Sequence, residues 1–350
     1  MESEKRFIAE TVRDAAHAQR SLRIRGSGSK DFYGNTLHGE LLSLDRYRGV
    51  VDYDPAELIL TARAGTALHE LEDLLAASEQ LLPFEPPHFG GGTLGGSIAT
   101  GLSGPRRAYA GSARDFVLGV HMIDGHGNEV RFGGQVMKNV AGYDVSRLMV
   151  GAMGTLGVLL QISLKVWPVR AELTLRFACD QRAALSRMQR WSLEGLPLSA
   201  SCHYTDELYV RFVGSEATLR QIERELGGEV VDDGAAFWRG IRDHSAEFFG
   251  SAATLWRISV PATTAPLYAG VPQLIEWGGA LRWLSGELDA AALRSQVEAC
   301  GGHVTLFRTS AGRGVPVFHP LKPPIARLHR QLKLVFDPRG IFNPRRMDSF

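Results

Sequence analysis

The first half of the chain alternates short apolar runs with turns rich in glycine and proline, a pattern typical of strands joined by tight connections. Apolar and polar positions alternate over residues 21–25, and a second strand is predicted over 58–64. Residues 116–132 predict a hairpin whose turn is rich in glycine. A further strand is predicted over 158–167, where a proline ends it.

One helix is predicted from apolar spacing directly after the second strand. Leu68, Leu71 and Leu75 fall on one helical face. Thr66 is the expected N-cap, because a threonine oxygen can accept a hydrogen bond from the free N–H groups of the first turn. Pro83 is expected to end the helix and to lead extended chain into the next segment.

The pattern changes after Pro168, where short strands begin to alternate with amphipathic helices. The predicted elements in order are strand 173–177, helix 181–194, strands around 204 and over 208–213, helix 216–226 and strand 229–231. A similar set recurs near 254–308, with strands over 255–260, 281–284 and 304–308. Strand–helix–strand–strand–helix–strand order predicts a ferredoxin-like antiparallel sheet with helices on one face, and so an α+β chain.

Length and composition narrow the class of protein. A chain of 350 residues predicts two domains, and contents of 44% hydrophobic and 22% charged residues are ordinary for a globular protein. The 39 lysines and arginines nearly balance the 38 acidic residues, which disfavours nucleic-acid binding. No run approaches the roughly 18 apolar residues of a spanning helix, so we expect no direct membrane insertion.

The cysteines and the first residues point to a cytoplasmic protein. Cys179, Cys202 and Cys300 are far apart and lack zinc or cluster spacing, so we expect reduced thiols and no metal site. Any iron–sulfur centre is therefore expected on another subunit. The charged residues 1–6 lack the apolar core of a signal peptide.

Three glycine-rich segments lie in the strand-rich half, at 26–30, 91–104 and 151–157. Glycines at this density let backbone N–H groups converge on an anion such as a pyrophosphate, or simply permit tight packing. The first segment lacks the third glycine of a dinucleotide fingerprint because Asp31 follows it, and a Walker A triplet is absent from the sequence. Three such segments in one region favour a ligand site over packing alone.

Four stretches together resemble a known family. The segments 93–99 (TLGGSIA) and 154–158 (GTLGV) resemble the FAD-binding domain of flavoproteins of the vanillyl-alcohol-oxidase or p-cresol methylhydroxylase (PCMH) type. Residues 136–157 resemble the FAD-binding subunits of glycolate oxidases, and 337–344 (DPRGIFNP) resembles the closing signature of the family. The likeness covers residues 20–170 and 330–347, and the middle only in outline.

The resemblance implies a domain order. A two-part PCMH-type FAD-binding domain is expected over 1–170, and a ferredoxin-like α+β cap domain over 171–320. The C-terminal segment 321–350 is expected to return to the FAD domain.

The resemblance also implies which residues bind FAD. The first loop should wrap the pyrophosphate, the second should run beside the pyrophosphate and ribityl chain, and the third should pass the adenine. The implied residues are Gly26, Ser27, Gly28, Ser29, Lys30, Gly92, Thr93, Leu94, Gly95, Gly96, Ser97, Ile98, Ala99, Ser103, Gly104, Gly154, Thr155, Gly157, Val158 and Asn343. Asn343 is either near the isoalloxazine or a turn residue. Some relatives attach FAD to a histidine of the first loop; Lys30 stands there instead, so the FAD is expected to be non-covalent.

Arg308, Arg313 and His319 are the candidate catalytic residues, because a 2-hydroxy acid needs a cationic clamp and a base. The histidine- and aspartate-rich cap motif of catalytic relatives is absent from the sequence, which leaves the oxidation to this chain or to a sister subunit.

The resemblance implies an FAD-binding subunit of a glycolate oxidase complex. Such a subunit would pass electrons from glycolate or D-lactate through flavin to a partner iron–sulfur subunit, with a sister flavin subunit in the complex. Two alternatives stay open: a non-catalytic flavin-binding assembly subunit and an autonomous FAD-dependent oxidase of the same fold. Peripheral association with the inner membrane through partners also stays open.

Overall fold

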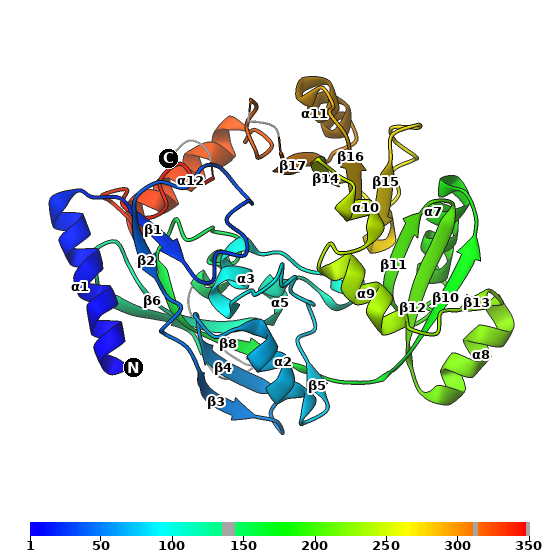
Figure 1. Cartoon of the computed structure of the whole chain (residues 1–350), viewed down its shortest axis with the longest axis horizontal. Helices are drawn as coiled ribbons and strands as arrows, with labels where there is room; N and C mark the ends of the chain where they lie inside the picture. Colours follow the sequence, from blue (N-terminus) through cyan, green and yellow to red (C-terminus); the bar gives the residue numbers. More distant parts are fainter. Residues whose placement is uncertain (135–143, 311–313, 348–350) are drawn as a thin grey trace. The chain divides into compact units, whose positions relative to one another are not determined.

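The computed structural model describes residues 1–134, 144–310 and 314–347. The chain forms two compact units (Figure 1). Unit 1 comprises Met1–Ser103, Ser112–Pro168 and Pro320–Phe350, and unit 2 comprises Gly104–Gly111 and Val169–His319. The short segment 104–111 therefore groups with the second half of the chain although it follows directly on the second glycine-rich loop.

Unit 1 is built around an antiparallel sheet with the strand order β3-β4-β8-β6-β7 in the part of the chain that is described. Its strands are β3 (Val50–Asp54), β4 (Ile59–Arg63), β6 (Val117–Ile123), β7 (Glu129–Gly133) and β8 (Val158–Lys165). The predicted strands and the hairpin correspond to β4, β6–β7 and β8. The neighbouring strands β8 and β6 are the most buried of this sheet, since six of the eight residues of β8 and six of the seven residues of β6 are buried.

A parallel pair of strands carries the first glycine-rich loop. β1 (Leu22–Arg25) pairs with β2 (Glu40–Ser43), and a bridge joins Leu22 to Phe342 near the C-terminus. The C-terminal segment thus lies beside β1 at Phe342, within unit 1. A second small pair joins β5 (Gln80–Leu81) to β9 (Trp167–Pro168).

Helices complete unit 1. They are α1 (Glu2–Ala18), α2 (Leu68–Ala76), α3 (Leu94–Thr100), α5 (Ala113–Phe116), α6 (Val145–Leu148) and α12 (Pro323–Phe336). The prediction that Thr66 caps α2 is wrong, because Ala67 occupies the N-cap. The Thr66 hydroxyl instead donates to the carbonyl of Arg63, 2.7 Å away. The helix also ends well before Pro83, since β5 intervenes.

Unit 2 contains one eight-stranded sheet, counted over the described residues, with the order β13-β10-β12-β11-β15-β16-β14-β17. Its first half has β10 (Ala171–Ala178), β11 (Leu198–Tyr204), β12 (Glu207–Gly214) and β13 (Glu229–Val230). Its second half has β14 (Thr254–Ser259), β15 (Gln273–Glu276), β16 (Leu281–Ser285) and β17 (His303–Thr309). When the four strands of each half are numbered along the chain and read from the outer edge of the sheet inward, both halves have the order 4-1-3-2. The two halves meet where β11 pairs with β15. The predicted recurrence of a ferredoxin-like set matches this topology.

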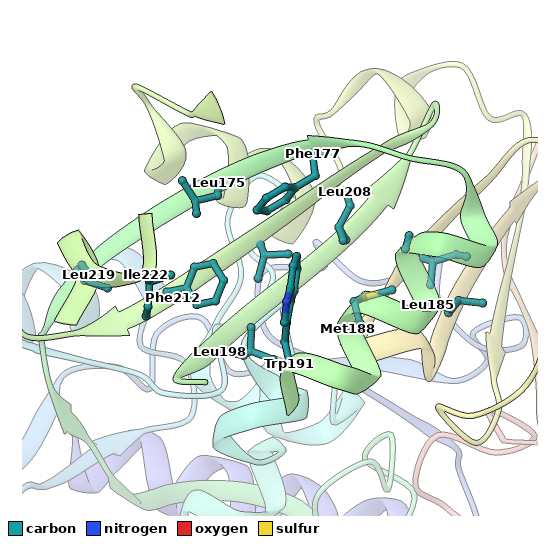
Figure 2. Packing of buried hydrophobic residues seen from close by; sticks show 13 residues of the cluster. Leu175, Phe177, Leu185, Met188, Trp191, Leu198, Leu208, Phe212, Leu219 and Ile222 are labelled. Carbon is teal, nitrogen blue, oxygen red and sulfur yellow. The ribbon is translucent and has the colours of Figure 1, made fainter. Parts of the chain in front are cut away.

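The helices of unit 2 are α4 (Arg107–Ala110), α7 (Gln181–Leu193), α8 (Glu216–Leu226), α9 (Gly234–Arg242), α10 (Glu247–Gly250) and α11 (Ala290–Ala299), with a 3₁₀ turn η1 (Trp277–Gly279). In the first half, α7 and α8 bury their apolar faces on the sheet (Figure 2). The cluster includes Leu175 and Phe177 of β10, Phe212 of β12, and Met188 and Trp191 of α7. Side chains two residues apart on a strand share a face, which is why this core is continuous.

Candidate functional site

A pocket in unit 1 is lined by all three glycine-rich segments. Its wall is formed by residues 24–31, Leu37, Leu44, Ala64, Thr93, Gly95, Gly96, Ala99, Thr100, Met153, Gly154, Gly157, Leu159, Asn343 and Arg346. Segments distant in sequence therefore meet at one concave site. Their convergence is the geometric reason to treat the glycines as ligand-binding residues.

The predicted cofactor residues divide into two groups by position. The first loop as a whole, Thr93, Gly95, Gly96, Ala99, Gly154, Gly157 and Asn343 line the pocket. Those outside the lining are Gly92, Leu94, Ser97, Ile98, Ser103, Gly104, Thr155 and Val158. Leu94, Ile98 and Val158 are completely buried, since they belong to the apolar faces of α3 and β8.

The first and second loops touch each other. A Cβ atom at Gly26 would lie 2.3 Å from Oγ1 of Thr93, so only glycine allows this approach. Gly28 adopts φ +84°, a conformation that other residues rarely accept. The loop is closed by an ion pair between Arg25 and Asp31, with Nε and Oδ2 separated by 2.9 Å.

The second loop enters α3 through Thr93, whose Oγ1 accepts a hydrogen bond from the N–H of Gly96 at 3.3 Å. A Cβ at Gly95 would lie 2.7 Å from the Cβ of Ala64. The helix can therefore pack against the end of β4 only because this position lacks a side chain. This contact places the main chain of α3 at the pocket wall.

The third loop is fixed by Asn343. Its side-chain Nδ2 donates to the carbonyl of Met153 at 2.7 Å, and Oδ1 accepts from the N–H of Ile24 at 2.8 Å. A Cβ at Gly154, which has φ +68°, would lie 2.6 Å from that Nδ2. Asn343 thus joins β1 to the third loop, and both polar ends of its side chain have protein partners.

Arg346 is a pocket residue that the sequence analysis missed. Its side chain is buried, and its guanidinium donates to the carbonyls of Lys30, Asp31, Tyr33 and Asn35. It therefore holds the chain that follows the first loop. The only sequence signal was its place two residues after the end of the closing signature 337–344.

A buried ion pair anchors the C-terminal segment. The Lys333 ammonium donates to Asp337 at 2.6 Å and to the carbonyls of Thr155 and Phe342 at 2.7 and 2.9 Å. Burial lowers the pKa of Lys333, and the Asp337 carboxylate opposes this shift. Asp337 also accepts from the N–H groups of Ile341 and Phe342. The pair links α12 to the third loop.

The pocket suits a dinucleotide cofactor. Its wall combines glycine main chain, which a ligand can approach closely, with the cationic side chains of Arg25, Lys30 and Arg346 against one carboxylate, Asp31. Lys30 is buried, with its ammonium 5.6 Å from the centre of the Phe89 ring. An excess of positive charge beside exposed main chain fits a diphosphate.

The candidate catalytic residues lie in unit 2. The Arg308 guanidinium donates to the carbonyl of Phe249 at 2.6 Å, and burial lowers its pKa. His319 Nδ1 accepts a hydrogen bond from the N–H of Val304 at 3.4 Å. Val304 lies on β17, four residues before Arg308. Arg313 lies outside the described residues, as do residues 136–143 of the family-like stretch 136–157.

Comparisons with known proteins agree with the interpretation of the pocket as a cofactor site. Residues 3–133 match the FAD binding domain family. The chain is 46% identical over 342 residues to the glycolate oxidase subunit GlcE of Escherichia coli (strain K12), covering 97% of this chain and 96% of that protein. It is 30% identical over 154 residues to a D-2-hydroxyglutarate dehydrogenase of Xanthomonas citri pv. viticola, covering 43% of this chain and 33% of that protein.

A solved structure supports the fold. An alkyldihydroxyacetonephosphate synthase superposes with a TM-score of 0.65 over 97% of this chain and 75% of its own, at 16% identity. The predicted α+β FAD-binding fold and the predicted family resemblance are confirmed. The chain belongs to the FAD-linked oxidoreductases and, within them, to the family of glycolate oxidase GlcE subunits.

Proposed function

We propose that unit 1 binds FAD non-covalently and that the chain serves as the FAD-binding subunit of a glycolate-oxidase-type complex. The observation that carries this proposal is the convergence of three glycine-rich loops on one pocket in a chain 46% identical to GlcE. When bound, FAD accepts the two electrons of the oxidised alcohol, and the protein binds and orients the reactants.

Each loop has a proposed role. Residues 26–30 would hold the pyrophosphate, with Lys30 supplying positive charge. Residues 93–99 would follow the pyrophosphate and ribityl chain, and 154–158 would pass the adenine. Asn343 would act through its two hydrogen bonds, which fix Ile24 and Met153 at the pocket wall.

Non-covalent attachment is part of the proposal. The first loop offers Lys30 where covalent relatives carry a histidine. His88 lies near the second loop, but its Nε2 is 3.0 Å from a carboxylate oxygen of Glu72, which supports a structural role.

The proposed electron path runs from a small 2-hydroxy acid through flavin to an iron–sulfur partner. A sister flavin subunit is proposed as a further partner. The described residues include no helix long and apolar enough to cross a membrane. We place the chain in the cytoplasm, where its three free cysteines would stay reduced, with any membrane contact made through partners.

A second function is a flavin-binding assembly subunit without turnover. It is favoured by Arg308, whose guanidinium donates to the carbonyl of Phe249, and by His319, which contacts Val304, four residues before Arg308 on β17. In that case the oxidation would take place on the sister subunit.

An anaerobic visible spectrum distinguishes these functions. The FAD-loaded chain is titrated with glycolate or D-lactate, first alone and then with its co-purified partners. Bleaching of the flavin band in the complex is expected. Bleaching in the isolated chain would assign oxidation to this subunit, whereas bleaching only with partners would assign it a relay. A chain that never binds FAD would contradict the proposal.

A further inference from the structure

The helix α12 of unit 1, drawn in orange in Figure 1, carries an apolar stripe on its surface. The α12 stripe consists of Ile325, Leu328, Leu332 and Val335, whose steps of three, four and three residues place them along one side of the helix. Leu328 and Val335 are 53% and 71% exposed, Ile325 is also exposed, and Leu332 is half-buried. In the described part of the chain, no other stretch of fifteen residues has as many exposed large apolar side chains as 321–335.

The helix is attached to unit 1 mainly through its last turn. Among its residues only Lys333 is buried. The carbonyl of Phe336 accepts a hydrogen bond from the N–H of Gly125 at 2.7 Å, and the ring of Phe336 lies edge-on to that of Phe132, with the ring centres 6.1 Å apart. A helix of about 12–15 residues is marginal by itself, so helices in proteins are stabilised mostly by burying an apolar face. The α12 stripe is such a face left uncovered by unit 1, which is typical of a docking surface.

The charge of α12 indicates which kind of surface it would bind. The helix contains no aspartate or glutamate, and Arg327 and Arg330 are both exposed. Asp337, which follows the helix, is buried in its ion pair with Lys333. The exposed side of α12 is therefore cationic as well as apolar. A complementary partner surface would carry apolar residues next to carboxylates.

A helix of another subunit fits this surface better than a second copy of the chain or a membrane. Steps of three and four residues form the seam against which a second helix packs its side chains. A second copy of α12 would bring two cationic surfaces together, and like charges repel. Anchoring of an amphipathic helix to anionic lipid usually takes about four to eight lysines or arginines, whereas α12 exposes only Arg327 and Arg330 between its described ends.

We propose that the α12 stripe docks an amphipathic helix of a partner subunit, with a carboxylate of that helix facing Arg327. The inference rests on the proposed function, because the partner is a subunit of the glycolate-oxidase-type complex. Arg327 directly precedes Leu328, so its side chain lies beside the stripe. Arg330 follows Leu328 by two residues, which is about 200° around the helix, so it points to the opposite side. The two arginines therefore differ in their distance from the partner.

The first test measures assembly of the full-length, FAD-loaded chain with the other subunits of its complex by calorimetry. Leu328→Gln and Val335→Gln should each weaken binding of the partner subunits by about tenfold or more, because each removes an apolar contact from the seam. FAD content and the urea midpoint of the isolated chain should stay unchanged, since both side chains are exposed. Leu193→Gln is the matched control, because Leu193 is 89% exposed at the end of α7 in unit 2 and should not affect assembly.

A second test examines the charge of the partner. Arg327→Gln should weaken assembly at least about threefold at low salt and much less at high salt, because ions screen an exposed charge pair. Arg330→Gln is its control and should have a smaller effect. In the assembled complex, carbodiimide should join the ammonium group introduced by Arg327→Lys to an aspartate or glutamate of a partner helix, which mass spectrometry locates. Unchanged affinity in Arg327→Gln together with no such cross-link would overturn the acidic partner.

The docking surface and the proposed function fail in different ways. Wild-type assembly in both Leu328→Gln and Val335→Gln overturns the docking surface alone. The same holds if these variants assemble normally but lose binding to vesicles of phosphatidylglycerol and phosphatidylcholine, or lose self-association in sedimentation, since the stripe would then serve a membrane or a second copy. If the wild-type chain binds no FAD, the proposed function fails, and assembly of the flavin-free chain with the other subunits still tests the surface.

Discussion

At the scale of single residues, the pocket depends on glycines whose Cβ atoms would collide with a neighbouring loop. Gly26 faces Thr93, Gly95 faces Ala64, and Gly154 faces Asn343. These contacts differ from a flexible glycine turn, because each glycine allows two pieces of main chain to approach. The pocket wall therefore consists of backbone atoms fixed by packing.

Replacing Gly26 or Gly154 with alanine should separate the loops and lower FAD affinity at least tenfold. The new Cβ would lie 2.3 Å from Thr93 Oγ1 in the first case and 2.6 Å from Asn343 Nδ2 in the second. Fluorescence titration with FAD measures the effect. Gly250→Ala is the control, since a Cβ at that position would meet no neighbouring atom within 4 Å. Wild-type affinity in both pocket variants would show that the loops do not form the FAD site.

Asn343→Asp should destabilise unit 1 by about 1–3 kcal/mol, because a carboxylate cannot donate to the Met153 carbonyl. The acceptor bond from Ile24 would remain. Urea denaturation measures the loss, and Asn35→Asp is the control, since the amide of this partly exposed asparagine bonds a carbonyl at the surface of the same unit. A variant as stable as the wild type would contradict the bridging role of Asn343.

At the scale of elements, two connections far apart in sequence determine how the segments meet. The C-terminal segment joins β1 through the bridge between Leu22 and Phe342. Lys333 then joins α12 to the third loop by reaching the Thr155 carbonyl. In unit 2, the turn between α9 and α10 places His244 in an aromatic cluster, stacked 3.9 Å from Phe249.

Lys333→Met should destabilise unit 1 by about 3–5 kcal/mol, because the Asp337 carboxylate would stay buried without its counter-charge. The double variant with Asp337→Leu should lose less than the sum of the two single variants. A double-mutant cycle in urea measures the coupling. Additive effects would contradict a coupled pair.

His244 should make unit 2 less stable as pH falls below about 6.5, the pKa of a histidine in an unfolded chain. Burial, followed by the charges of Arg308 and Arg257, holds its folded pKa well below that value. Between the two pKa values the unfolded chain binds a proton that the folded chain does not. The free energy of unfolding therefore falls with pH, by at most about 1.4 kcal/mol per pH unit.

His244→Phe tests this prediction, because it keeps an aromatic ring and removes the titrating group. Urea denaturation followed by tryptophan fluorescence should show a smaller loss of stability between pH 7 and pH 5 in the variant. Trp283, 4.7 Å from the His244 ring, is a suitable reporter. An equal loss of stability in the wild type and the variant would contradict the assignment of this pH dependence to His244. Other histidines are present in both and cancel in the comparison.

At the scale of the whole molecule, local patterns predicted the strands better than the helices. Alternating apolar positions identified β10, β12 and β17, since a half-buried strand has a simple period of two. The helix α12 was missed because only Lys333 among its residues is buried. Its apolar residues therefore do not form the buried stripe by which a helix is recognised in a sequence. The helix α1 was also missed, although Ile8 and Val12 are buried on one side.

The site was predicted in part. The glycine-rich segments could be recognised in the sequence, because glycine is the residue that allows two pieces of main chain, or a ligand and the main chain, to approach closely. Arg346 and Lys333 were missed because their role depends on carbonyl groups of residues distant in sequence, which leave no local signal.

The most direct test of FAD binding by unit 1 is the flavin content of the purified chain and its fate on acid precipitation. The chain is saturated with FAD, freed of excess cofactor and precipitated, and flavin is measured in both fractions. We predict one FAD per chain, recovered entirely in the supernatant. A folded chain that retains no flavin would contradict the assignment of the pocket, and flavin that stays with the precipitate would contradict non-covalent binding.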